Sequence, residues 1–231
     1  MRNFFRRLLK FLKYFLIIYF GSTLFFVILF RFVNPPVTPL MLIRSAGQLR
    51  EGVAVKMEKK WVGLDEMSPN LPLAVVSSED NLFMEHHGFD LKSIEKAKEF
   101  NERKKGKRLK GASTISQQTA KNVFLWPERS WLRKGLEVYF TVLIEAVWGK
   151  KRIMEVYLNV IETGKGLYGV EAASQEYYGK PASRVSRGEA ALLAAILPNP
   201  RKWSPLSPTP YLLGRQQWIL WNMNNIGKVD W

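Results

Sequence analysis

The feature that most constrains the fold of this chain is an uncharged apolar run near its N-terminus. Residues 14–30 contain no charged side chain, and with the next three residues they form a stretch of 20. As a helix this stretch is about 30 Å long, the thickness of a bilayer's hydrocarbon core. The Asn-Pro-Pro sequence at 34–36 predicts its end, because proline does not continue a helix. We therefore predict a transmembrane helix over residues 14–33, with Arg31 extending to the interface.

Basic residues precede this run and predict its orientation. The first 13 residues hold five basic side chains and no acidic one, at Arg2, Arg6, Arg7, Lys10 and Lys13. Basic flanks stay on the cytoplasmic side of a membrane, so we expect residues 1–13 to form a cytoplasmic tail and the rest of the chain to lie outside. A cleaved signal peptide is less favoured. The run exceeds the usual h-region of about 7 to 15 residues, and no small-x-small cleavage site follows it.

The net charge of +15 and the absence of cysteine limit the function further. Without cysteine, disulfide scaffolds, thiol nucleophiles, cysteine-ligated zinc and iron–sulfur clusters are excluded. The charge predicts an acidic partner: nucleic acid, an anionic membrane surface or a phosphorylated substrate. Six basic residues belong to the first 33, so the other 198 hold 29 basic against 20 acidic residues, or +9. Composition alone does not choose among these partners.

Apolar residues recur at helical spacing through most of the remaining chain, which predicts a mainly α domain. Capping and stop residues set the expected helices, namely Ser68 to His86, Asp90 to Arg103, Ser113 to Asn122, Ser130 to Trp148, 152–162, 168–178, 189–197 and 211–224. Ser186 and Glu189 form a capping box before the seventh. Residues 104–110, KKGKRLK, are expected to form a basic loop. Only residues 53–62 show strand-like alternation.

Two acidic positions lie among apolar residues and are candidates for chemistry. Glu79 and Asp80 follow the apolar segment 73–76, and Glu137 lies within the apolar helix predicted from Ser130. Apolar surroundings favour the protonated form of a carboxyl group, which suits a general acid or base. Both positions also have a purely structural explanation. Glu79 and Asp80 also fit a solvent face at a helix end, and Glu137 fits an ion pair with Arg133 or Lys134.

The segment 111–118, GASTISQQ, brings a glycine, hydroxyls and amides to a predicted helix N-terminus. The free N–H groups of such an end attract anions, and four cations follow within 21 residues of Ser113, at Lys121, Arg129, Arg133 and Lys134. This combination predicts a diphosphate cradle. The glycines at 164, 166 and 169 match GxGxxG, but no strand precedes them, so a turn between helices is the better interpretation. His86 and His87 lack the HExxH spacing of zinc hydrolases.

Taken together, these residues resemble the peptidoglycan glycosyltransferases, glycosyltransferase family 51, and specifically the monofunctional biosynthetic transglycosylases. Five motifs carry the resemblance in order, namely Glu79-Asp80-x-x-Phe83-x-x-His86-x-Gly88-x-Asp90, Gly111-x-Ser113-Thr114-Ile115-x-Gln117-Gln118-x-x-Lys121-Asn122, Arg133-Lys134-x-x-Glu137, Lys150-x-x-Ile153-x-Glu155-x-Tyr157-Leu158-Asn159 with the three glycines, and Glu189-Ala190-Ala191-x-Leu193-Ala194 with Pro198, Pro200 and Pro205. Thr163 departs from the pattern where an aromatic residue is common, and Asn81-Leu82 where basic residues often follow.

The resemblance implies a mainly α, lysozyme-like glycosyltransferase domain over residues 72–231, with a second lobe associated with the membrane. Residues 34–71 would be a membrane-proximal connector. The implied activity is polymerisation of lipid II into β-1,4-linked glycan strands by inverting glycosyl transfer, with release of polyprenyl diphosphate. Such a protein would sit in the bacterial inner membrane, crossing it once, with its catalytic domain on the extracytoplasmic side.

The resemblance also implies roles for individual residues. Glu79 would be the general base, and Glu137 would orient the cations or assist departure of the diphosphate. Substrate binding would fall to Asp80, Phe83, His86, Ser113, Thr114, Gln117, Gln118, Lys121, Asn122, Arg129, Arg133 and Lys134. No metal ligands are assigned, although a requirement for Mg²⁺ or Mn²⁺ is left open. The expected partners are lipid II, the growing glycan strand and membrane lipids, with other cell-wall or division proteins left open and no nucleic acid.

Two other classes remain as alternatives. A lytic transglycosylase or lysozyme-type hydrolase would also be a helical domain with one essential glutamate, but it has no need of the cation cluster, since its substrate lacks a diphosphate. A membrane-tethered nucleic-acid-binding protein would use the +9 charge directly.

Overall fold

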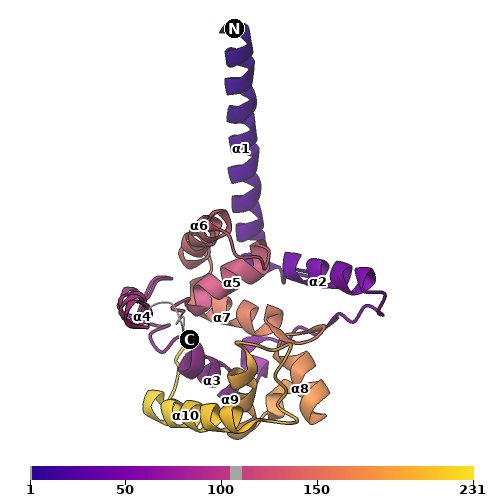
Figure 1. The fold of residues 1–231 in the computed structure, drawn as a ribbon, viewed down its shortest axis with the longest axis vertical. Coiled ribbons are helices and arrows are strands. Elements are labelled where there is room, and N and C mark those ends of the chain that lie inside the picture. The colour runs from indigo at the N-terminus through magenta and orange to yellow at the C-terminus, as the bar shows by residue number, and fades with distance from the viewer. Residues whose placement is uncertain (1, 105–110) are drawn as a thin grey trace.

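The computed structural model describes residues 2–104 and 111–231, and within these ranges the chain is mainly helical, with very little strand (Figure 1). The α-helices are α1 (Arg2–Phe32), α2 (Pro39–Arg50), α3 (Asn70–Glu79), α4 (Leu91–Arg103), α5 (Ile115–Phe124), α6 (Trp131–Val147), α7 (Gly149–Val160), α8 (Val170–Tyr178), α9 (Arg187–Ile196) and α10 (Pro210–Ile226). Short 3-10 helices occupy Leu64–Glu66 and Ala182–Arg184. The prediction of a mainly α domain is confirmed. All but the first residue of the predicted basic loop 104–110 lie outside the described residues.

The N-terminal helix α1 projects from the rest of the molecule (Figure 1). Residues Phe4–Phe32 are long and apolar enough to cross a membrane. The helix ends at Phe32, as the prolines at 35 and 36 predict. Its N-terminal end precedes the predicted transmembrane stretch by more than three turns, so the basic tail continues the same helix.

Several polar contacts fix the C-terminal part of α1 to the body. The Trp148 indole donates to the carbonyl of Val27 at 2.7 Å, and the hydroxyls of Thr23 and Tyr139 lie 2.8 Å apart. The Arg152 guanidinium donates to the carbonyl of Phe30 at 2.9 and 3.1 Å, which satisfies a carbonyl that the helix end leaves free. The anchor and the body are therefore joined along helices α6 and α7.

The body consists of two helix groups that meet at the core. Helices α3, α9 and α10 pack together, and α5 packs between α6 and α7. Three short strands, β1 (Glu58–Lys59), β2 (Glu162–Gly164) and β3 (Leu167–Tyr168), form a sheet in the order β1-β3-β2. Strand β3 pairs in parallel with β1 and antiparallel with β2. The glycine motif thus lies between α7 and α8, as predicted, but it forms a short β-hairpin where only a loop was expected.

Some predicted boundaries are wrong. The helix predicted from Ser68 to His86 ends at Glu79, and the next residues form turns. Asp80 leaves the helical conformation, with φ −163° and ψ 78°, and its carboxylate bonds to the N–H of Ile115 outside the helix. Thr114, not Ser113, caps α5, since its hydroxyl accepts from the Gln117 amide at 3.2 Å. Sequence reasoning missed α2, although Thr38 followed by Pro39 is a helix start signal.

Gly169 provides a test of this packing. Its φ is +83°, and a Cβ there would lie 2.8 Å from the carbonyl oxygen of Asn159. We expect Gly169→Ala to lower the free energy of unfolding by about 2 kcal/mol or more, measured by denaturant titration of the detergent-solubilised protein. Gly179→Ala is the control, because φ is +63° but no atom lies within 4 Å, and its loss should be about 1 kcal/mol. Equal losses at the two positions would contradict the close approach.

Candidate active site

Glu79 occupies the last position of α3 and is the best-placed acid in the molecule for proton transfer. Its side chain is 14% exposed. One carboxylate oxygen accepts from Gln118 Nε2 at 3.0 Å, and the other accepts from Arg215 Nη2 at 3.3 Å. Because one oxygen carries an amide and the other a cation, the carboxylate is held in one orientation while part of it remains open to solvent.

Gln118 connects Glu79 to the buried hydroxyl of Tyr157. The Tyr157 hydroxyl donates to Gln118 Oε1 at 3.2 Å, and the Gln118 amide donates to Glu79. Burial raises the pKa of Tyr157 well above its ordinary value, and the charges of Glu79 and Asp80 raise it further. Tyr157 therefore stays protonated and acts as a donor, which fixes the Gln118 amide with its N–H toward Glu79.

Asp80, the residue after Glu79, is buried. Its carboxylate accepts the N–H of Ile115, the first residue of α5, at 3.0 Å, and it contacts His86 Nε2 at 2.9 and 3.0 Å. The Gly88 N–H donates to His86 Nδ1 at 3.1 Å, so the proton of the neutral ring is on Nε2, facing Asp80. This arrangement ties the end of α3 to the start of α5.

Other predicted binding residues also hold the loops in place. Phe83 is fully buried, with the Lys150 ammonium 4.6 Å from its ring centre. Thr114 and Gln117 bond to each other in the capping box, and the Thr114 hydroxyl also donates to the Gly88 carbonyl at 2.7 Å. Ser113 is exposed at the mouth of this region.

The predicted cations gather around Glu137 on α6. Glu137 is 3% exposed, and its oxygens accept from Arg133 Nη1 and Lys134 Nζ, each at 2.5 Å. The ion pair considered from sequence is therefore present, with both partners at once. Two cations against one carboxylate leave the cluster positively charged, with Arg133 largely buried and Lys134 partly exposed to solvent, and this excess of charge favours an anionic ligand.

The charges of both Glu79 and Glu137 act on Lys121 of α5. Burial lowers its pKa, and the charges of Arg133 and Lys134 lower it further, while Glu137 and Glu79 act in the opposite direction. The pKa of Lys121 thus depends on both carboxylates and on the other cations. Asn122 beside it is buried, and its Nδ2 has no partner among the described residues. Arg129 is exposed outside the cluster.

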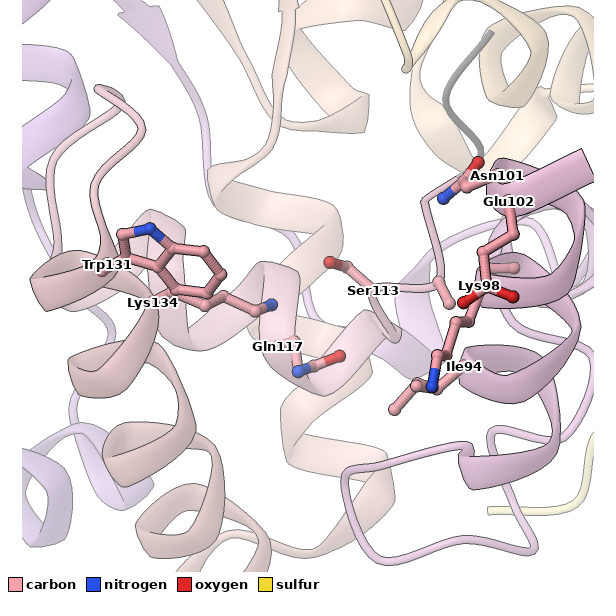
Figure 2. Close-up of a pocket in the computed structure, with 10 residues that line it drawn as sticks. Ile94, Lys98, Asn101, Glu102, Ser113, Gln117, Trp131 and Lys134 are labelled. Carbon is pink, nitrogen blue, oxygen red and sulfur yellow. The ribbon is translucent and has the colours of Figure 1, made fainter. Parts of the chain in front are cut away.

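A groove of about 850 Å³ opens beside these residues, between α4 and the N-terminal ends of α5 and α6. Figure 2 shows Lys134 and Gln117 between Trp131 on one side and the α4 residues Ile94 and Lys98 on the other. Trp131 is 93% exposed. The groove therefore offers an apolar wall next to charged and amide groups, which suits a ligand that has both sugar and charged parts.

Sequence reasoning missed two residues that contact this site. Arg215 reaches Glu79 from α10, and Tyr157 reaches Gln118 from α7. Tyr157 belongs to the fourth sequence motif, but the motif alone assigned it no function in the site. Arg215 lies outside all five motifs and 136 positions from Glu79, and a single arginine on an apolar helix gives no local sign of such a contact.

The described residues do not fit a resident divalent cation. Among them, no group of three or more His, Cys, Asp or Glu side chains could hold a metal ion. Both oxygens of Glu137 accept hydrogen bonds from cations, and a metal ion there would have to lie beside these positive charges. We therefore derive no step through Mg²⁺ or Mn²⁺.

Comparison with known proteins identifies the family of this chain. The family described as Transglycosylase matches residues 47–224. A biosynthetic peptidoglycan transglycosylase from Bacteroides thetaiotaomicron is 53% identical over 223 residues, which cover 96% of this chain and 89% of that protein. One from Pseudomonas aeruginosa is 46% identical over 231 residues, covering 100% of this chain and 97% of that protein. The predicted lysozyme-like helical fold is confirmed, and this chain belongs to the Transglycosylase family.

Proposed function

We propose that this protein polymerises lipid II into linear β-1,4-linked glycan strands of peptidoglycan, by inverting glycosyl transfer with release of polyprenyl diphosphate. The observation that carries the proposal is that α5, whose Gln118 bonds to Glu79, packs against α6, which holds the cluster of Arg133, Lys134 and Glu137. A proton acceptor and an anion site are thus adjacent, as attack on a sugar diphosphate requires. The names of the relatives support the same activity.

Glu79 serves as the general base in the proposed reaction. Its carboxylate takes the proton of the acceptor's 4-hydroxyl as that oxygen attacks the anomeric carbon of the donor. The new C–O bond forms as the bond to the diphosphate oxygen breaks, so the α linkage becomes β and the diphosphate leaves with the bonding electrons. The contacts from Gln118 and Arg215 orient the carboxylate for this step.

The cation cluster stabilises the leaving group. Lys121, Arg133 and Lys134 face a diphosphate of low basicity, which needs charge stabilisation more than protonation. Glu137 is assigned to orient these cations, because both of its oxygens are bonded to them. Arg129 and Ser113, both exposed, remain proposed contacts to the diphosphate and the sugars at the mouth of the site.

The buried members of the predicted set position the reacting groups. Asp80 and His86 join α3 to α5, while Thr114 and Gln117 set the first turn of α5. Phe83 and Asn122 support these elements from inside. We assign them to positioning, with Gln117 also facing the groove.

The apolar helix α1 fits a single-pass membrane anchor. We further propose that residues 1–13 are a cytoplasmic tail, 14–33 the membrane span, 34–71 a membrane-proximal connector and 72–231 the catalytic domain on the extracytoplasmic side of the inner membrane. The basic flank of α1 supports this orientation. Neither alternative class is favoured. A glycan hydrolase does not need the cation cluster around Glu137, and a nucleic-acid-binding protein does not need an oriented Glu79 carboxylate.

Replacement of Glu79 tests the general base. Glu79→Gln keeps the shape of the side chain and removes its basicity, so the rate of lipid II polymerisation in detergent should fall by about 100-fold or more. Asp65→Asn is the matched control, because Asp65 forms an exposed ion pair with Lys151, and its rate should be unchanged. A Glu79→Gln enzyme that keeps more than about a tenth of the wild-type rate contradicts the assignment.

Arg215 tests the positioning of that base. Arg215→Met removes the hydrogen bond to Glu79. We expect kcat to fall by about tenfold with KM changed less than about twofold, because the Glu79 carboxylate is then less well oriented for proton transfer while substrate binding is unaffected. Arg215→Lys should recover part of kcat. Arg187→Met, which breaks a bond to Asn224 at the other end of α10, is the control. A rise in KM with constant kcat would show instead that Arg215 binds substrate.

The lowered pKa of Lys121 predicts a pH dependence. As the pH rises, this ammonium loses its proton earlier than a free lysine, so kcat/KM should decline on the alkaline side below the ordinary lysine range. Lys121→Arg keeps its charge at every such pH and should move the decline to higher pH. Lys151→Arg, at an exposed ion pair, should leave it in place. An unchanged profile in Lys121→Arg would exclude Lys121 as its source.

A further inference from the structure

Helix α10 exposes a row of aromatic side chains that the proposed reaction does not use. Tyr211, Trp218 and Trp221 are 56%, 47% and 61% exposed. At about 100° per residue, the three lie within one quarter of the helix circumference. Gly214 lies between Tyr211 and Trp218 on the same side, and a Cβ there would have no atom within 4 Å. We call this row, Tyr211 to Trp221 with Gly214, the α10 aromatic face.

The row has the dimensions and chemistry of a sugar-binding surface. Tyr211 and Trp218 are seven residues apart, which is about 10.5 Å along the axis and comparable with the length of a disaccharide. The gap at Gly214 leaves the helix backbone open between the rings. Exposed amides of Gln217 and Asn225 flank the rings. Aromatic faces pack on the C–H faces of sugar rings, and amides bond to hydroxyl and N-acetyl groups.

The charge of the helix also fits a neutral polymer. Arg215 is the one charged residue of α10, and it turns inward to Glu79. A chain with a net charge of +15 therefore presents an uncharged helix face here. An anionic lipid surface or a nucleic acid would require cations at this position, whereas the sugar backbone of a glycan requires none.

The location of the α10 aromatic face argues against a membrane surface as its occupant, and its area argues against a second copy of the chain. Helix α10 lies at the end of the molecule opposite the free part of α1 (Figure 1), so it does not face the membrane that α1 crosses. Three rings, each about half exposed, offer at most about 400 Å² if a whole aromatic side chain buries about 150 to 250 Å². A standard protein interface uses about 800 Å² per partner, so this face is too small for a stable dimer.

We propose that the α10 aromatic face binds the sugar backbone of a peptidoglycan glycan strand, at a site separate from the catalytic groove. The identity of this occupant rests on the proposed function, whereas the existence of a sugar-binding face does not. Such a site would hold the enzyme on existing or newly made strands while the groove takes lipid II. Because Arg215 on the inner side of α10 contacts Glu79, a strand bound outside lies one helix away from the base.

The test is co-sedimentation of the full-length, detergent-solubilised protein with purified peptidoglycan sacculi stripped of their stem peptides. In the Trp218→Ala/Trp221→Ala variant we expect the amount bound to fall by about tenfold while detergent lipid II polymerisation stays within about twofold of wild type. Leu213→Ala is the matched control, since Leu213 is 45% exposed on another side of α10, and it should bind normally. Gly214→Ala, which fills the gap between the rings, should weaken binding without unfolding α10.

Each other outcome overturns the proposal. If Lys121→Gln abolishes sedimentation and the double tryptophan variant does not, the strands bind only in the catalytic groove. If the tryptophan variant changes the sedimentation coefficient in analytical ultracentrifugation but not binding to sacculi, the face joins two copies of the chain. If wild type and Leu213→Ala bind sacculi no better than the tryptophan variant, no such site exists. If the tryptophan variant also loses lipid II polymerisation, the face is not separate from the catalytic groove. A wild-type protein that binds sacculi but does not polymerise lipid II would refute the proposed function and leave the sugar-binding face in place.

Discussion

The active site depends on one buried carboxylate, that of Asp80. It accepts the first N–H of α5 and contacts His86, whose other nitrogen accepts from Gly88. A buried carboxylate without such donors would cost several kcal/mol, so α3 has to end where these donors are. This ending places Glu79 at the last turn of α3, beside Gln118 of α5, and removes it from the interior of a longer helix.

The second constraint is the balance of charge around Lys121. Glu137 bonds to Arg133 and Lys134. Its charge also opposes the lowering of the Lys121 pKa that burial and those two cations cause. The Glu137 carboxylate bonds to both Arg133 and Lys134, but its single negative charge neutralises only one of their two positive charges. In the proposed reaction the remaining positive charge is satisfied by the diphosphate, and the cluster is then most stable when the leaving group carries its full negative charge.

Local signals in the sequence predicted the elements that local physics determines. Asp90, Ser130 and Ser186 cap the helices they were expected to cap, and Glu137 lies with the predicted cations. The end of α3 was mispredicted because the bond that causes it joins Asp80 to a residue 35 positions away. Arg215 was missed for the same reason, at still longer range. The cap of α5 at Thr114 was predictable from local sequence, since Thr-x-x-Gln is a capping-box signal as clear as Ser-x-x-Glu.

Helix α6 gives the site its relation to the membrane. Tyr139 bonds to Thr23 of α1, nine residues before the end of that helix at Phe32, or about 14 Å along its axis. Glu137 lies two residues before Tyr139, so the cation cluster and the anchor contact belong to the same stretch of one rigid helix. The cluster is thereby held in a fixed position relative to α1. In the proposed reaction, the polyprenyl chain of the donor can stay in the lipid while its diphosphate reaches Lys121, and the glycan extends away from the membrane toward α10.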